Sequence, residues 1–81
     1  MKLYDLIITI SKDIKYISRY DIYDYQHKLI LQDSSLDDFV KVFGDCEILD
    51  YETYSLGKII NNNQSIDITV VQIKLNCYIG R

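Results

Sequence analysis

Apolar residues recur with the spacing of an α-helix in the middle of the chain, over residues 35–43. The positions i, i+3, i+4 and i+7 of this stretch are Leu36, Phe39, Val40 and Phe43. Because this spacing places all four side chains on one side of a helix, it predicts a helix here. Ser34 or Ser35 can cap the first turn with a hydroxyl oxygen, and Gly44 can end the helix by adopting a left-handed conformation.

Residues 2–11 carry a second apolar stripe with helical spacing. Its members are Leu3, Leu6, Ile7 and Ile10. The same segment contains the run Ile-Ile-Thr-Ile, which also suits a strand because β-branched residues pack well on a pleated surface. The spacing favours a helix, and a strand is the alternative.

The rest of the chain shows the alternation of apolar and polar residues that is typical of strands. Residues 14–23 alternate and predict a half-buried strand. The polar residues 24–28 predict a turn, and a returning strand begins at residue 29. Residues 46–56 and 66–75 predict two further strands, separated by an asparagine-rich turn.

Three features interrupt this alternation. Ile48 and Leu49 are adjacent and would point to opposite sides of a sheet, so a bulge or burial on both sides is expected. The apolar parity of the last strand switches after Val70, which predicts either a central strand covered on both sides or a bulge. Gly57 is expected to bend or pause its strand, and the tail 76–81 is expected to be loose.

The order of these elements is α-β-β-α-β-β. We therefore predict an α+β fold in which two helices pack on a four-stranded antiparallel sheet. Residues 1–81 form a single domain in this prediction, since the chain has no linker and no internal repeat. A chain of this length buries a modest fraction of its surface, so a homodimer is a reasonable expectation.

Negative charge is concentrated between Asp33 and Gly57, where seven acids accompany one base. Asp37 and Asp38 lie in the first turn of the predicted helix, near the positive end of its dipole, and Lys41 can pair with either. A surface of this kind keeps a small protein in solution, or it faces a basic partner. Both interpretations are open at the level of sequence.

Residue types that carry catalysis or bind metals are sparse. His27, the single histidine, falls in a predicted turn and is expected to be an ordinary surface residue. Cys46 and Cys77 are expected to be reduced thiols, and a disulfide between them requires two strands to place them side by side. One histidine and two distant cysteines do not make a standard zinc site, and the three glycines are too far apart to form a phosphate-binding loop. We expect neither an enzyme nor a bound cofactor or metal.

Charge and hydropathy also limit the partners and the compartment. The sequence pI is near 4.8 and the basic residues are scattered, which argues against direct binding to nucleic acid. The chain has no apolar stretch long enough to cross a membrane, and we expect no signal peptide. We therefore expect a protein of the bacterial cytoplasm.

Eight tyrosines are more than the core of so small a domain can hold. Tyr16 and Tyr20 are expected in the core. The others are either strand-forming residues favoured by an AT-rich gene, or exposed anchors of an interface with another protein.

Small size, acidity, AT-rich codon usage, surface tyrosines and missing catalytic motifs resemble the small accessory proteins of phages and other mobile elements. In composition and organisation the chain is similar to anti-CRISPR and other anti-defence inhibitors, some of which present acidic faces to nucleic-acid-binding grooves. The resemblance implies a non-enzymatic inhibitor that binds a basic surface of a host protein. The residues expected to bind that partner are Asp37, Asp38, Asp45, Glu47, Asp50, Glu52, Tyr51 and Tyr54. The alternative is a small homo-oligomeric structural or assembly module.

Overall fold

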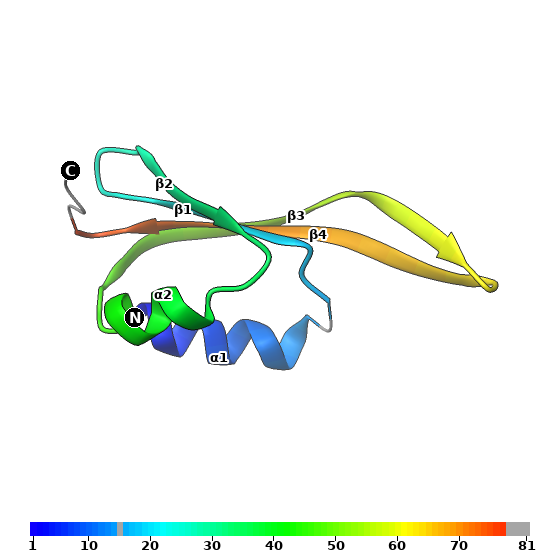
Figure 1. Cartoon of the computed structure of the whole chain (residues 1–81), viewed down its shortest axis with the longest axis horizontal. Coiled ribbons are helices and arrows are strands. Elements are labelled where there is room, and N and C mark those ends of the chain that lie inside the picture. The colour runs from blue at the N-terminus through cyan, green and yellow to red at the C-terminus, as the bar shows by residue number, and fades with distance from the viewer. Residues whose placement is uncertain (15, 78–81) are drawn as a thin grey trace.

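The protein is an α+β structure with two helices and four strands (Figure 1). The computed structural model describes residues 1–14 and 16–77. In chain order the elements are α1 (Leu3–Asp13), β1 (Arg19–Tyr23), β2 (Leu29–Asp33), α2 (Asp37–Phe43), β3 (Ile48–Asn61) and β4 (Gln64–Leu75). The kinds of element and their order agree with the sequence analysis, and α1 resolves the first segment in favour of a helix.

The four strands form one sheet in the order β2-β1-β4-β3. The pairs β1–β2 and β3–β4 are antiparallel hairpins, as expected, but the two central strands β1 and β4 run parallel. The prediction of a wholly antiparallel sheet is therefore wrong. Turn residues specify how consecutive strands pair, whereas the direction in which two hairpins dock depends on contacts between distant segments.

Both helices cover the same side of the sheet (Figure 1). The apolar stripe of α1 supplies Leu3, Leu6 and Ile10 to the core. The other buried members of the core cluster are Ile22, Leu36, Val71, Ile73 and Leu75. The core therefore lies between α1 and the two central strands.

Helix α2 is shorter than predicted, and its ends differ from those expected. It begins at Asp37, whose N–H donates to Ser35 Oγ at 3.3 Å, so Ser35 contributes to the cap while Leu36 occupies the cap position. Gly44 is right-handed at φ −60, not left-handed as predicted. A Cβ at Gly44 would lie 2.5 Å from the backbone oxygen of Val40, so it is lack of space that favours glycine here.

Strand β1 starts at Arg19, later than the alternation predicted. Tyr16 is exposed and was wrongly assigned to the core, whereas Tyr20 does pack against it. At the other end of the chain, Asn76 and Cys77 are held: Asn76 N–H donates to Glu47 O at 2.8 Å, and Cys77 O accepts from Tyr25 N–H at 3.2 Å. The expectation of a loose tail is wrong for these two residues, and residues 78–81 lie outside the described part of the chain.

The long hairpin β3–β4 extends past both helices (Figure 1). We call residues 56–68 the arm. Its tip is a two-residue turn in which Asn62 and Asn63 both have positive φ, as a tight hairpin turn requires. The pairing shifts between Ile48 and Asp50, as predicted, and again between Ser55 and Gly57. Ser55 Oγ accepts from Gly57 N–H at 3.2 Å and so holds the second bulge, at which the arm begins.

The parity switch of β4 also has a clear explanation. Val70 and Val71 are both fully buried and point to opposite sides, because β4 is a central strand at this position. The bulge lies instead in β3, opposite this part of the hairpin.

Candidate functional site

The side of the sheet that faces away from the helices, here called the helix-free face, is largely polar. Val71 and Ile73 pack against the core on the helix side, so the alternate residues of β4 point the other way. Residues paired across strands share a side, which places Asp21 of β1 and Glu52 of β3 on the helix-free face. Across the sheet, a polar row runs through Gln32, Asp21, Gln72 and Glu52.

Asp21 is the centre of this row and is 2% exposed. Its Oδ1 accepts from Arg19 Nε at 2.9 Å and from Gln32 Nε2 at 3.1 Å. Its Oδ2 accepts from Arg19 Nη2 at 3.3 Å and from Gln72 Nε2 at 3.5 Å. Donors from three strands therefore meet on one carboxylate and tie the middle of the sheet together.

The surroundings of Asp21 determine what it can do chemically. Burial alone would raise the pKa of its carboxyl, but the hydrogen bonds from Arg19, Gln32 and Gln72 outweigh burial and lower that pKa below its ordinary value. Both oxygens are occupied by donors, so the carboxylate is ionised and has no free position from which to take a proton from a substrate. The Asp21 carboxylate therefore stabilises the pairing of the strands, and its position is not that of a general base.

The predicted acidic residues divide between two surfaces. Asp37 and Asp38 lie in the first turn of α2, on the helix layer. Asp50 and Glu52 pair with Lys74 and Gln72 of β4, so they lie on the helix-free face at an outer strand. The sequence placed all of these residues in one stretch, but the fold turns the chain between α2 and β3 and separates them.

Ion pairs distinguish the acidic residues further. Asp38 pairs with Lys41 at 3.8 Å, and Asp45 pairs with Lys2 at 3.8 Å. Glu47 lies 3.4 Å from the N-terminal ammonium. Among the described residues, the carboxylates without an ion pair within 4.0 Å include Asp37, Asp50 and Glu52.

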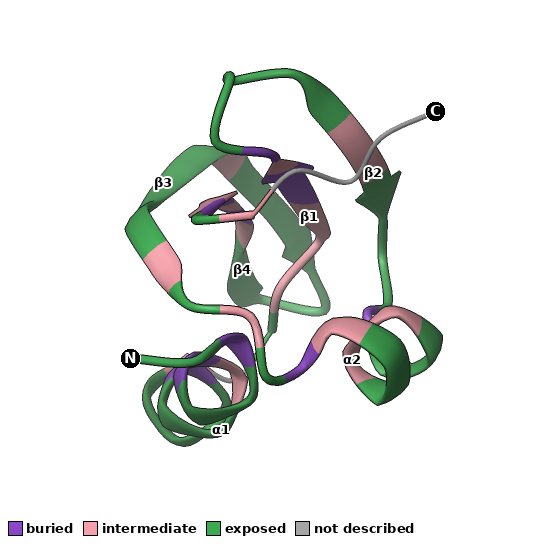
Figure 2. Ribbon diagram, turned by 90° about the vertical axis from the view of Figure 1, so that its left-hand side faces the viewer, coloured by how far each residue is buried: buried purple, intermediate pink, exposed green. Residues whose placement is uncertain are grey.

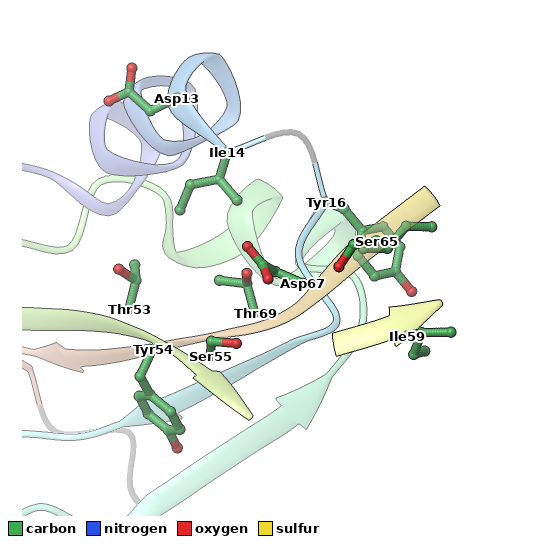
Figure 3. A pocket seen from close by; sticks show the side chains of 11 residues that line it. Asp13, Ile14, Tyr16, Thr53, Tyr54, Ser55, Ile59, Ser65, Asp67 and Thr69 are labelled. Atoms are coloured by element: carbon green, nitrogen blue, oxygen red, sulfur yellow. The ribbon is translucent and has the colours of Figure 1, made fainter. Parts of the chain in front are cut away.

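The two tyrosines of the predicted site point in different directions. Tyr54 pairs with Val70, lies on the helix-free face and is partly exposed, close to Arg19. Tyr51 pairs with Ile73 and lies on the helix side at the edge of the sheet. Figure 3 shows Tyr54 pointing away from its neighbour Thr53, which lies on the same side of the strand as Tyr51. The structure therefore brings together Asp50, Glu52 and Tyr54, and it places Tyr51 on the other side of the same strand.

A large open hollow lies under the arm, on the helix side of the hairpin (Figure 3). Its volume is about 890 Å³, and it is bounded by the end of α1 and by the inner side of β3 and β4. Its polar groups are mostly hydroxyls, including those of Thr53, Ser55 and Thr69. The carboxylate of Asp67 in its wall pairs with Lys58 at 3.9 Å.

The single histidine is a surface residue, as expected. His27 is exposed in the turn between β1 and β2 and stacks on Tyr23, with ring centroids 4.6 Å apart. Within the described part of the chain, no group of three or more His, Cys, Asp or Glu residues is placed to hold a metal ion. In the same part, no helix is long and apolar enough to cross a membrane.

The fold and surface define a small α+β protein with a mixed sheet and a polar, helix-free face. Comparisons with protein-family models, with curated proteins and with solved structures give no match to this chain.

Sequence reasoning missed the cluster around Asp21. Gln32 lies on the next strand and Gln72 on a strand that is distant in the chain, so only the register of the sheet brings both to Asp21. The alternation of apolar and polar residues around Asp21 could have revealed the cluster. It places a charged residue on a short central strand, where that residue requires hydrogen-bond partners from the neighbouring strands.

Proposed function

We propose that this protein is a non-enzymatic inhibitor of phage or mobile-element type that binds a basic surface of a host protein. The observation that carries the proposal is the outer strand β3, where Asp50 and Glu52 lie exposed beside Tyr54 without an ion pair among the described residues. Carboxylates without an ion pair beside an aromatic residue suit a partner rich in Lys and Arg.

We infer that the partner binds only one of the two acidic surfaces. The acids of the helix layer are partly neutralised by Lys2, Lys41 and the N-terminal ammonium. Glu52 lies opposite Gln72, so no cation of the neighbouring strand faces it. We therefore place the partner on the helix-free face, with Asp50, Glu52 and Tyr54 as its contacts, and expect Asp37 and Asp38 to contribute little.

Two charge-reversed variants test this proposal. Asp50→Lys with Glu52→Lys changes the helix-free face, and Asp37→Lys with Asp38→Lys makes the same change of charge on α2. A tagged wild-type protein is used to identify a stoichiometric partner in lysate of a low-GC bacterium, and affinities of both variants for that purified partner are then measured at low and physiological salt.

The strand variant should bind at least about tenfold more weakly than wild type, and wild-type binding should weaken as salt rises. The helix variant should bind as wild type does. Equal binding by wild type and the strand variant would refute the proposed surface, and a loss confined to the helix variant would move the site to α2.

A second candidate function, a homo-oligomeric module, is favoured by the arm. Its exposed apolar side chains are Leu56, Ile59, Ile60 and Ile66. The arm is a two-stranded ribbon with both edges open, because β1 pairs with β4 only from Val70 onward. Its two charges, on Lys58 and Asp67, pair with each other, so two copies of the arm would approach without net repulsion.

The oligomeric state tests this candidate. Ile60 is 79% exposed on the arm, and Val42 is 73% exposed on α2, so Ile60→Lys and Val42→Lys are matched changes. If the arm joins two copies, light scattering will show a dimer for wild type and Val42→Lys and a monomer for Ile60→Lys. A monomeric wild-type protein at high micromolar concentration would reject this function.

A further inference from the structure

The two cysteines of the chain meet at the end of the sheet opposite the arm. Cys77 follows β4 and Cys46 precedes β3, and their sulfur atoms lie 3.3 Å apart with Cys77 Sγ donating to Cys46 Sγ. Both thiols are half-buried and pack against the core cluster. The condition stated for a disulfide, that strands place the two residues side by side, is therefore met.

The backbone around both cysteines is already fixed. Cys46 O accepts from Leu3 N–H at 2.8 Å, and Cys46 N–H donates to Phe43 O at 3.0 Å. Next to Cys77, Asn76 N–H donates to Glu47 O at 2.8 Å. A disulfide needs the two sulfurs about 2.05 Å apart. Closing the remaining gap requires small rotations of the side chains and no large movement of the backbone.

We propose that Cys46 and Cys77 form a redox-active dithiol site, which a small disulfide of the oxidised-glutathione class converts to an intramolecular disulfide. In the first step one protein sulfur, as thiolate, attacks a sulfur of the oxidant, and the first thiolate of the oxidant leaves with the proton that the protein thiol released. The second protein sulfur then attacks the first, and the mixed disulfide breaks. The second thiolate of the oxidant departs and takes the remaining proton. Two protein sulfurs are oxidised and two oxidant sulfurs are reduced.

The order of attack follows from the hydrogen bond. Cys77 Sγ donates to Cys46 Sγ, so this hydrogen bond stabilises a thiolate at Cys46. Burial raises the pKa of the Cys77 thiol to about 11, assisted by the hydrogen bond to Cys46 and by the negative charge of Asp24. Because the thiolate is the nucleophile, Cys46 attacks first and Cys77 closes the disulfide.

A disulfide here would close the long hairpin into a ring. The two residues are separated by 31 positions, and the turn at Asn62 and Asn63 already joins the strands at the far end. Cross-linking a loop of this length removes much of the conformational freedom of the unfolded chain. The disulfide would also fix the junction at which the N-terminus, the α2–β3 link and the β1–β2 turn meet β4.

The test incubates the native full chain with oxidised and reduced glutathione and measures free thiols, intact mass and thermal midpoint. The protein should lose both free thiols and two hydrogen atoms of mass, without a glutathione adduct. Its thermal midpoint should rise by on the order of 10 °C, and dithiothreitol should reverse both changes. Cys77→Ser should instead accumulate a glutathione adduct at Cys46, and Cys46→Ser should react more slowly.

Three outcomes would overturn the proposal: persistent glutathione adducts on the wild-type protein, disulfide-linked dimers, or two unreacted thiols. A parallel reaction in denaturant keeps the test independent of the folding of the serine variants. There the disulfide should form at least roughly tenfold less readily, since the unfolded chain no longer holds the sulfurs together. Equal yields in the native and denatured protein would also refute a preformed site.

Discussion

At the scale of single residues, the carboxylate of Asp21 joins three strands through its hydrogen bonds. A buried carboxylate is costly unless charged and polar donors surround it. Arg19 comes from the same strand, whereas Gln32 and Gln72 belong to the two neighbouring strands. The interaction therefore stabilises one register of the sheet, since a slip of either neighbour by one residue would move its glutamine to the other side.

Replacing Asp21 by Asn should reveal this interaction through its pH dependence. At neutral pH the variant should lose about 1–3 kcal/mol of unfolding free energy, the range for a hydrogen-bonded charged group that is removed. Because the folded pKa of Asp21 is lowered, its contribution is present above the ordinary carboxyl pKa of 3.8 and disappears as the pH falls through the lower folded value. Urea unfolding between pH 7 and pH 2 should show the two proteins converging at acid pH.

The matched control is Asp67→Asn. Asp67 forms an exposed ion pair with Lys58 on the arm, so its loss should change the unfolding free energy by less than about 1 kcal/mol. A difference between wild type and Asp21→Asn that stays constant with pH would contradict a role for the ionised carboxylate.

The elements show which parts of the fold can be derived from local pattern. Helix α1 and the turn at Asn62 and Asn63 follow from spacing and composition, because their hydrogen bonds lie within a few residues. The bulge after Ile48 follows from two adjacent apolar residues. By contrast, the parallel pairing of β1 with β4 brings Tyr20 next to Val71 across most of the chain, and no local signal encodes it.

The candidate site, too, can be predicted from the sequence only in part. The acidic stretch and its tyrosines are visible in the sequence, but their separation onto α2 and the helix-free face is not. The bend between Gly44 and Ile48 separates these residues, because the chain there crosses from the helix layer to an outer strand. The proximity of Cys46 and Cys77 likewise depends on the pairing of β3 with β4.

The arm is the element whose stability differs most from the rest. An isolated two-stranded ribbon is marginally stable in water, and the arm has neither a third strand nor a helix against it. Figure 2 shows the buried residues close to the helices and the central strands. In the monomer, backbone amides of residues 58–66 should exchange with solvent at least roughly tenfold faster than those of residues 70–75.

Hydrogen exchange followed by mass spectrometry or NMR measures this difference directly. The internal control is β4 itself, since a single continuous strand runs from the exposed arm into the buried centre of the sheet. Equal protection along the whole of β4 in a monomeric sample would show that the arm is stabilised by contacts that are not present in this structure.

At the scale of the whole molecule, the arm makes the protein elongated. Its extents are 45 × 22 × 20 Å and its radius of gyration is 13.4 Å. A compact chain of this length would have a radius of gyration of about 11.7 Å. The core cluster contains no residue of the arm, so the arm adds length without adding to the buried core.

Removing the arm should therefore leave the fold of the monomer intact. Ser55 and Thr69 are paired across the hairpin, so residues 56–68 can be replaced by an Asn-Gly turn that joins them. We expect the shortened protein to retain its circular dichroism and to melt within about 5 °C of the wild-type monomer. Its thermal midpoint should not change with protein concentration. For wild type, a midpoint that rises with concentration would show association through the arm, because binding between native copies stabilises the folded state. If the shortened chain failed to fold, the conclusion that the core is complete without the arm would be wrong.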